Sequence, residues 1–312
     1  MTSNLENSYN EFLLTKIKEI FTKKEVDAFL EACENQRPTV LRVNTLLKKR
    51  KELINLLYQR KIEMSTLDWC KEGIVAFKAG NPLGATPEYL AGYYIIQGAN
   101  SFLPVLNLGL EENQIVVDLC AAPGGKTTHI AQLMNNTGVI YANEIEKERT
   151  HSLKSNLHRM NVINCIITNM DANDFNVGKV DRVLLDAPCS GTGVISKDAS
   201  VKTTKSAIEI KKIQKIQKKL ILHAFDMLKP NGVMVYSTCS ILVEENEEVL
   251  DYLLRNRKNA KIEEPDVSVG KNGFMSFRGQ DFSNEIKKAK RIYPHVHNMD
   301  GFFYCKISKK AM

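Results

Sequence analysis

The sequence is most constrained by a regular alternation of short apolar runs and longer helical segments from residue 88 onward. The apolar runs predict strands at 115–119, 138–143, 165–169, 182–185 and 232–237. Segments with helical spacing lie around them, at 88–107, 126–135, 146–160, 207–228 and 244–255. Because short buried strands that alternate with helices build parallel sheets, the sequence predicts a doubly wound α/β domain over residues 86–312. A last pair of strands is expected near 291–294 and 302–307.

The residues before this domain follow a different pattern. Apolar side chains recur at helical spacing between residues 5 and 35, so N-terminal helices are expected within residues 1–36. They are followed by a β-like run at 39–44, a helix near 48–60 and a second β-like run at 73–77. This pattern predicts a small α+β, RRM-like RNA-binding module over residues 37–85, closed by a turn-rich junction at 80–87.

Composition and cysteine usage narrow the class of protein. Lysine and arginine (43) exceed aspartate and glutamate (36), but a net charge of +7 does not by itself identify a nucleic-acid partner. The seven cysteines form no CxxC pair and no His/Cys cluster, so we expect reduced thiols, no disulfide scaffold and no bound metal. The polar, acidic N-terminus resembles neither a secretory signal nor a transit peptide, and no apolar run approaches the ~20 residues of a membrane helix. These features predict a soluble intracellular protein.

The first predicted strand of the main domain runs into an unusual loop. Its apolar residues end at Asp118, and the sequence LCAAPGGKT follows. Small residues let the backbone approach a ligand closely, and free N–H groups at the start of the next helix would face it. The adjacent Gly124 and Gly125 do not match a dinucleotide fingerprint, and Cys120 stands where a P-loop has glycine. Both phosphate-binding interpretations are therefore weak. An ordinary tight turn would not explain why the apolar strand ends with an aspartate, Asp118.

Acidic residues also follow the next two predicted strands. Glu144 follows the second strand, where a carboxylate can accept hydrogen bonds from ribose hydroxyls. Taken alone, Glu144 also fits a charge at a helix N-terminus, which is the more common role. Asp171 follows the third strand and could accept a hydrogen bond from an adenine amino group. Because Asp118, Glu144 and Asp171 occupy successive strand ends, the set indicates a nucleoside cofactor.

Two cysteines follow the fourth and fifth predicted strands, in the sequences DAPCSGTG and STCS. A lone cysteine is usually a small buried hydrophobe, but hydroxyl-bearing and loop-forming residues flank both Cys189 and Cys239. A thiolate that adds to C6 of a cytosine makes C5 nucleophilic enough to take a methyl group, helped by a carboxylic acid and a further acid–base group. Asp186, Cys189 and Cys239 supply that set, although spacing alone does not choose the attacking thiol. The target base must be unpaired or flipped out of its stack.

Three segments resemble the signature motifs of the NOL/NOP/Sun family of RNA cytosine-5 methyltransferases. They are Asp118–Thr127 (DLCAAPGGKT), Asp186–Gly193 (DAPCSGTG) and Ser237–Ser240 (STCS). The resemblance covers roughly residues 37–308 and implies a Rossmann-like fold that binds S-adenosylmethionine. Other segments are similar to the nucleolar proliferation-antigen branch, whose substrate is large-subunit ribosomal RNA. These are Gly84–Gly92, Ile195–Thr203 and Tyr293–Phe303.

The resemblance implies a role for each candidate residue. The methionine part of the cofactor would be wrapped by Cys120, Ala121, Ala122, Pro123, Gly124, Gly125 and Lys126. Glu144, which many family members replace with Asp, would bind the ribose, and Asp171 would lie by the adenine. Asp186 would lie between cofactor and base, with Lys126 as a second catalytic group. Cys239 is implied as the nucleophile and Cys189 as the thiol that helps release the product, whereas the Pro-Cys thiol attacks in DNA cytosine-5 enzymes.

The branch also implies partners and a location. The substrate would be large-subunit ribosomal RNA in a pre-ribosomal particle, with no membrane partner, and the enzyme would be monomeric and nucleolar, or cytoplasmic in a source without a nucleus. Members of the branch carry a long charged N-terminal extension, whereas this sequence begins almost at the shared core. Basic clusters at 48–51, 211–219 and 287–291 are candidates for contacting phosphates. Two alternatives stay open: a cytosine-5 methyltransferase of tRNA or DNA, and an RNA-binding ribosome-assembly factor whose catalysis is secondary.

Overall fold

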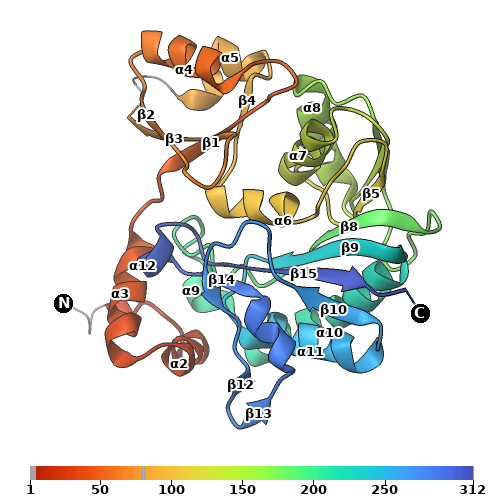
Figure 1. The fold of residues 1–312 in the computed structure, drawn as a ribbon. Helices are drawn as coiled ribbons and strands as arrows, with labels where there is room; N and C mark the ends of the chain where they lie inside the picture. The colour runs from red at the N-terminus through yellow and green to blue at the C-terminus, as the bar shows by residue number, and fades with distance from the viewer. Residues whose placement is uncertain (1–4, 79, 81, 312) are drawn as a thin grey trace.

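The chain folds into three parts, shown in Figure 1: a pair of N-terminal helices, a small sheet with its helices, and a large sheet with helices on both faces. The structure is a computed structural model that describes residues 5–78, 80 and 82–311, so residue 81 of the turn-rich junction lies outside the described residues. Within those ranges, no helix is both long enough and apolar enough to cross a membrane.

The N-terminal segment forms two helices, α2 (Glu11–Ile20) and α3 (Lys23–Glu34). They are separated at Thr22, whose backbone N–H donates to the Glu25 carboxylate at 3.2 Å and caps the start of α3. Their apolar faces, which include Leu13, pack against Ile241 and Tyr293 of the large domain. These helices therefore share a core with the large domain, although the small module follows them in the chain.

The small module is a four-stranded antiparallel sheet with helices on one face. Its elements are β1 (Thr39–Val43), α4 (Arg50–Gln59), β2 (Glu63–Thr66), β3 (Gly73–Lys78), η1 (Leu83–Ala85), α5 (Pro87–Leu90) and β4 (Tyr94–Ile96). The strand order β2-β3-β1-β4 and the β-α-β-β-α-β sequence are those of a ferredoxin-like module. The last strand, β4, lies beyond residue 85, so the sheet continues past the boundary expected from the sequence.

The prediction of one continuous helix over residues 88–107 is wrong. The structure has α5 and β4 there, followed by η2 (Ala99–Phe102) and α6 (Leu103–Leu106). Gly92 follows α5 with a φ of +74°, and a Cβ at that position would lie 1.8 Å from the carbonyl oxygen of Arg159. The chain therefore turns sharply at Gly92, and the next apolar run extends as a strand because it pairs with β1.

The large domain is built on a nine-stranded sheet in the order β11-β14-β15-β9-β8-β5-β6-β7, with β10 paired to β15. The parallel strands are β5 (Ile115–Asp118), β6 (Val139–Asn143), β7 (Cys165–Thr168), β8 (Val180–Asp186) and β9 (Leu228–Thr238). They confirm the predicted doubly wound sheet. The chain order reverses between β5 and β8, and ligands bind at the carboxyl ends of strands beside such a switch point.

Antiparallel strands extend this sheet beyond β9. They are β10 (Ala260–Glu263), β11 (Lys271–Asn272), β14 (Lys290–Ile292) and β15 (Phe302–Lys309). The predicted last pair of strands corresponds to β14 and β15, and pairing with β9 makes the whole sheet mixed. A separate ribbon and two short helices connect these strands: β12 (Ser276–Phe277), β13 (Gln280–Asp281), η4 (Asn284–Lys288) and α12 (Pro294–His297).

Helices cover both faces of the large sheet, as Figure 1 shows. They are α7 (Gly125–Leu133), α8 (Lys147–Arg159), α9 (Val201–Thr204), α10 (Ala207–Asp226), η3 (Val243–Glu245) and α11 (Glu247–Asn256). On β5, Val116 shares a cluster with Ile130 of α7, while Val117 shares another with Leu220 of α10. Burial of both faces explains why the strand sequences are continuously apolar instead of alternating.

Candidate active site

The loop after β5 is shaped by one glycine at the start of α7. Gly124 is the N-cap residue of α7 and has a φ of +97°, which glycine adopts far more readily than other residues. A Cβ at this position would lie 2.9 Å from Cδ1 of Leu153. The backbone N–H of Ala121 donates to the carbonyl of Asn143 at 2.8 Å, which ties the loop to the end of β6. The loop therefore keeps one path past the carboxyl end of β5.

A cavity of about 200 Å³ lies beside this loop, at the predicted switch point. The candidate site residues that line it are Cys120, Ala121, Ala122, Pro123, Gly125, Lys126 and Asp186. Asp118 and Gln97 line it as well. Gly124 belongs to the loop but packs toward Leu153. The structure thus brings most of the predicted cofactor residues around one cavity.

Two predicted cofactor residues lie outside the lining of this cavity. Glu144 follows β6 and is buried. Its carboxylate accepts a hydrogen bond from the backbone N–H of Glu146 at 3.0 Å and forms an ion pair with Arg149 at 3.3 Å. Asp171 lies beyond β7 and is exposed; the backbone N–H of Asn173 donates to it at 2.8 Å and lowers its pKa. Both lie at the same edge of the sheet as Asp118, and the hydrogen bonds that the structure describes for their carboxylates come from residues two positions further along the chain.

Asp118 has one carboxylate oxygen without a partner. Its Oδ2 accepts from the Thr127 hydroxyl at 2.7 Å, whereas Oδ1 is buried with no hydrogen bond to any residue that the structure describes. Burial raises the pKa of Asp118 from 3.8 to about 7. A buried, unpaired acceptor is costly, so this oxygen suits a ligand that brings an N–H or ammonium group into the cavity.

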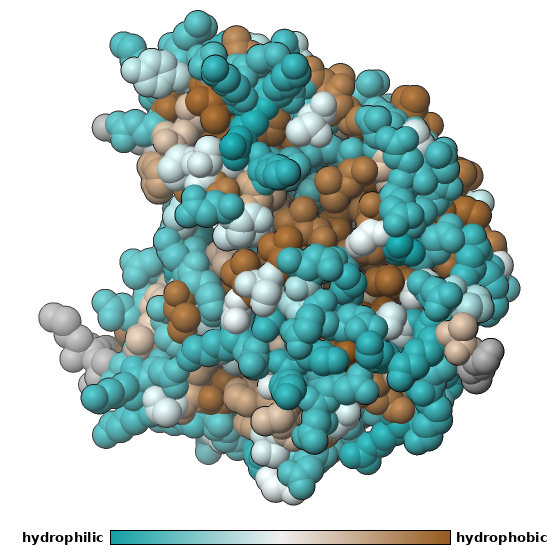
Figure 2. Space-filling model, viewed as in Figure 1, coloured by the Kyte–Doolittle hydropathy of each residue, from teal (hydrophilic) through white to brown (hydrophobic). Residues whose placement is uncertain are grey.

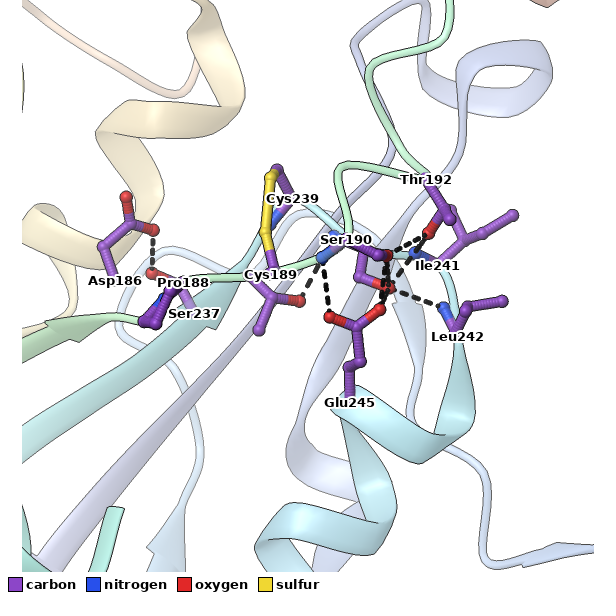
Figure 3. Close-up of a disulfide and its surroundings, with 12 residues drawn as sticks. Asp186, Pro188, Cys189, Ser190, Thr192, Ser237, Cys239, Ile241, Leu242 and Glu245 are labelled. Atoms are coloured by element: carbon purple, nitrogen blue, oxygen red, sulfur yellow. Dashed lines mark hydrogen bonds between the residues drawn. A yellow bond between two sulfur atoms is a disulfide. The ribbon is translucent and has the colours of Figure 1, made fainter. Parts of the chain in front are cut away.

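Asp186, at the end of β8, is held on both sides. The Lys126 Nζ donates to Oδ2 at 2.6 Å, and the Ser237 hydroxyl donates to Oδ1 at 2.7 Å. Lys126 comes from the first turn of α7 and Ser237 from the end of β9, so three elements fix this one carboxylate. Asp186 lies between the cavity and the loops that carry the two candidate thiols (Figure 3).

The structure joins Cys189 and Cys239 as a disulfide, with their Cα atoms 6.4 Å apart (Figure 3). The backbone N–H of Cys239 also donates to the Sγ of Cys189 at 3.2 Å. The expectation of reduced thiols throughout is therefore wrong for this pair. The physical reason is convergence: neighbouring parallel strands, β8 and β9, end at the same edge and deliver both sulfurs to one point. The two cysteines that the sequence singled out are thus brought into direct contact.

The remaining cysteines are free. Burial raises the pKa of Cys33, Cys70 and Cys165 to about 12, so these thiols are poor nucleophiles. Cys305 is also buried. Across residues 5–78, 80 and 82–311, no group of three His, Cys, Asp or Glu side chains has the arrangement of a metal site.

One basic cluster predicted to contact phosphates faces solvent only in part, since Lys287 is exposed. Lys290 and Arg291 are buried, and Arg291 pairs with the buried Glu247 at 2.5 Å. Strand β14 pairs with β15 and turns these side chains inward, so the prediction for this part of 287–291 is wrong. Lys211 and Lys215 of α10 are exposed, as expected.

The sequence analysis missed Arg42, which connects the small module to the cavity. Its guanidinium is fully buried and donates to Gln97 Oε1 at 2.9 Å, to the Gly125 carbonyl at 2.5 Å and to the Thr128 hydroxyl at 2.7 Å. Burial lowers the pKa of Arg42 to about 9, and the group is still charged at neutral pH. An arginine inside the apolar strand sequence TVLRV was the signal that could have identified it.

The sheet order, the small-residue loop after the central strand and the acidic strand ends define the class of Rossmann-like methyltransferases. A family model described as 16S rRNA methyltransferase RsmB/F matches residues 105–308. A second model, the N-terminal domain of 16S rRNA methyltransferase RsmF, matches residues 10–99. The chain belongs to the RsmB/F methyltransferase family, which confirms the resemblance drawn from its motifs.

Individual relatives agree with this assignment. A 28S rRNA (cytosine-C(5))-methyltransferase of Mus musculus is 49% identical over 97% of this chain and 39% of its own length. A tRNA (cytosine(49)-C(5))-methyltransferase of Pyrococcus abyssi is 36% identical, with 96% of each chain covered. The crystal structure of a methyltransferase homolog protein from Pyrococcus horikoshii matches with a TM-score of 0.89 and 33% identity, over 99% of this chain and all of that one. The chain spans less than two thirds of the length of the first rRNA methyltransferases that it matches.

Proposed function

We propose that the chain is an S-adenosylmethionine-dependent RNA (cytosine-5)-methyltransferase that modifies large-subunit ribosomal RNA. The observation that carries the proposal is the contact between Cys189 and Cys239 beside Asp186. Methyl transfer to a nitrogen or oxygen has no use for a thiol nucleophile, whereas transfer to a pyrimidine carbon requires covalent activation of the ring. Two thiols and a carboxylate at the edge of the cofactor cavity are the groups that this activation needs.

The residues around the 200 Å³ cavity fit S-adenosylmethionine. The loop from Cys120 to Lys126 passes close enough to wrap the methionine part, and the unpaired Oδ1 of Asp118 would accept a hydrogen bond from its ammonium group. Glu144 would bind the ribose and Asp171 the adenine, because both follow strands that end at the same edge as β5. When bound, the cofactor supplies an electrophilic methyl group on sulfur.

The chain's own residues perform the covalent steps with the thiol pair reduced. The Cys239 thiolate adds to C6 of the cytosine, and the electron pair of the C5–C6 bond moves to C5, which then takes the methyl group. Asp186, held by Lys126 and Ser237, stabilises the adduct at the base N3 and amino group. Loss of the C5 proton to a base restores the double bond as the Cys239 sulfur leaves, and Cys189 assists this release.

The two thiol roles are tested by substituting each cysteine alone. Wild type, Cys239→Ala and Cys189→Ala are incubated under reducing conditions with S-adenosylmethionine and total RNA. We expect Cys189→Ala to accumulate a denaturant-stable protein–RNA adduct and Cys239→Ala neither to form it nor to methylate. The reversed pattern would assign the attack to Cys189. Absence of methyl transfer by wild type to any RNA would favour the alternative of an RNA-binding assembly factor.

RNA as the substrate is supported by a second, larger cavity of about 670 Å³. It lies between the open face of the small sheet and the loops at 196–197 and 297–300, where Figure 2 shows the surface hollowed on the left. Phe77 on β3 is 62% exposed and lines it, as does Lys197. An exposed aromatic ring on the open face of such a sheet is suited to stacking an unpaired base.

This larger cavity is connected to the thiol loops. The backbone N–H of Gly301 donates to the carbonyl of Gly193 at 2.8 Å, and that of Gly193 donates to the carbonyl of Cys239 at 2.8 Å. Ile96 and Gln97 line both cavities. An RNA strand in the larger cavity would therefore run directly toward the site of chemistry.

Ribosomal RNA is preferred as the substrate because relatives that are 49% and 46% identical to this chain are named as 28S and 25S rRNA (cytosine-C(5))-methyltransferases. Transfer RNA is the second candidate, since a relative that this chain matches over nearly its whole length is named as a tRNA (cytosine(49)-C(5))-methyltransferase. Methylation of purified large-subunit rRNA and tRNA in parallel, with mapping of the product by bisulfite sequencing, separates the two. The proposal extends to a pre-ribosomal particle as the setting and, in a eukaryote, to the nucleolus as the location.

A further inference from the structure

Glu245 is a buried carboxylate that the proposed chemistry does not use. It is the last residue of η3 and is 0% exposed. Burial raises its pKa, and every hydrogen-bond partner that the structure describes for its carboxylate is uncharged. Burying such a group without a cation is costly, so its contacts indicate what it does.

Four donors converge on this carboxylate, as Figure 3 shows in part. Oε2 accepts from the backbone N–H of Ser190 at 2.9 Å and from Nε2 of Gln217 at 3.0 Å. Oε1 accepts from the hydroxyls of Ser190 at 2.5 Å and Ser240 at 2.6 Å. Two oxygens provide about four acceptor positions, so the donors match the carboxylate fully.

Three of the four donors belong to the residues that directly follow the two cysteines. Ser190 follows Cys189 in the loop after β8, and Ser240 follows Cys239 in the loop after β9. One carboxylate therefore clamps both cysteine loops by accepting hydrogen bonds from each, and these loops also contact each other directly through the Thr192 and Ser240 hydroxyls, 3.0 Å apart. Gln217 strengthens the clamp, because its Nε2 also donates to the carbonyl of residue 188 at 2.9 Å. Both sides of Cys189 are thus fixed to Glu245.

The backbone of Glu245 is itself held in place. The hydroxyl of the fully buried Tyr236 donates to its carbonyl at 2.6 Å. The next residue, Asn246, donates from Nδ2 to the Ser240 carbonyl at 2.9 Å and accepts from the Thr238 hydroxyl at 2.6 Å. The clamp is therefore anchored to the end of β9 through Tyr236 and Thr238, and to the loop beyond Cys239 through the Ser240 carbonyl.

We propose that Glu245 is a positioning residue that sets the separation and orientation of the Cys189 and Cys239 sulfurs. Its catalytic consequence rests on the proposed function, whereas its effect on the thiol pair does not. Displacement of a reacting group by about 1 Å can lower a rate by about 100-fold. Loss of the clamp should therefore reduce turnover strongly while leaving the cofactor cavity, which Glu245 does not line, intact.

The first measurement follows the thiol pair without any RNA. Wild type, Glu245→Ala and Glu245→Gln are equilibrated with reduced and oxidised glutathione, and the Cys189–Cys239 disulfide is quantified by alkylation and mass spectrometry. In this exchange the protein dithiol is oxidised and one glutathione disulfide is reduced to two thiols. We expect the equilibrium constant to fall about tenfold or more in Glu245→Ala. Glu245→Gln should lie between, because its amide can still bond both serine hydroxyls.

A matched control is Asp251→Asn on α11. Asp251 is also a buried carboxylate, but it accepts from the backbone N–H of Ser283 and pairs with Arg255, outside both cysteine loops. We expect it to leave the disulfide constant within twofold of wild type even where it lowers the melting temperature. If Glu245→Ala does not fold, Ser190→Ala and Ser240→Ala each remove one donor and should shift the constant in the same direction.

The second measurement is methyl transfer under reducing conditions. We expect Glu245→Ala to lower kcat about 100-fold with the KM for S-adenosylmethionine changed less than twofold. A folded Glu245→Ala variant whose disulfide constant and kcat both stay within twofold of wild type would overturn the proposal. If wild type methylates no RNA while Glu245→Ala still lowers the disulfide constant, the positioning role is supported and the proposed function fails.

Discussion

Arg42→Met should weaken both the fold and cofactor binding, because Arg42 joins the small module to the loop after β5. The substitution keeps an apolar stem of similar shape but removes the guanidinium that donates to Gln97, Gly125 and Thr128. Gly125 is the first residue of α7 and lines the 200 Å³ cavity that is proposed to hold the cofactor. Without the guanidinium, the Gly125 carbonyl and Oε1 of Gln97 each lose one charged donor, although the Thr128 hydroxyl still donates to the carbonyl at 3.0 Å.

The size of the effect follows from these three bonds. A hydrogen bond to a charged group contributes about 1.5–3 kcal/mol, and burial of the ion offsets several kcal/mol of the total. We therefore expect the free energy of unfolding to fall by about 2–4 kcal/mol, which lowers Tm by roughly 3–6 °C for a chain of this size. Affinity for S-adenosylmethionine should fall about tenfold, or about 1.4 kcal/mol.

Urea unfolding followed by circular dichroism measures the first quantity and titration calorimetry the second. Arg50→Met, at the start of α4, makes the same chemical change in the same module and should stay within about 0.5 kcal/mol of wild type. If Arg42→Met unfolds at the wild-type urea midpoint and binds the cofactor equally well, the buried guanidinium does not stabilise this junction.

Three further changes probe the cofactor loop and the RNA surface. Asp118 has a pKa of about 7 in the folded protein against 3.8 unfolded, so its contribution to stability is lost as pH rises from about 4 to about 7. Urea unfolding should show wild type, but not Asp118→Asn, losing on the order of 4 kcal/mol over that range; a difference between the two that does not vary with pH contradicts this. Phe77→Ala should raise the KM for RNA roughly 5- to 100-fold with little change in kcat. The control is Tyr58→Ala, because Tyr58 is exposed on α4 across the sheet, and it should change neither constant. Equal effects of the two substitutions would exclude a specific stacking role for Phe77. Gly124→Ala should cost about 1–3 kcal/mol in thermal unfolding because of its positive φ and the contact with Leu153, and an unchanged Tm would contradict that strain.

The sequence was sufficient to predict the parallel sheet and the edge that carries the site. Strands such as β5 are buried on both faces, so their sequences are continuously apolar. These apolar runs are also shorter than helices, and this difference in length distinguishes the two. Parallel strands end at one edge, so residues that follow different strands, such as Asp186 and Cys239, could be expected to meet. The roles of the two thiols came from the family resemblance, because spacing treats them alike.

Features that depend on pairing between distant segments could not be predicted. The run Tyr94–Ile96 was assigned to a helix, and only its hydrogen bonds to β1 make it a strand. Glu245 looks like an ordinary acidic residue at a helix start, and its burial depends on the loops at 190 and 240 folding over it. The role of Arg42 could not be predicted for the same reason, since its acceptors lie more than 50 residues away in sequence.

The docking of α2 and α3 on the large domain has a consequence for synthesis of the chain. Leu13 packs in one cluster with Tyr293, and 280 residues separate them. At about 5–20 residues per second, the ribosome needs roughly 14–56 s to make the second after the first. Until then α2 and α3 lack part of the apolar surface that covers them in the folded protein, so their burial is complete only after a segment made about 280 residues later has docked.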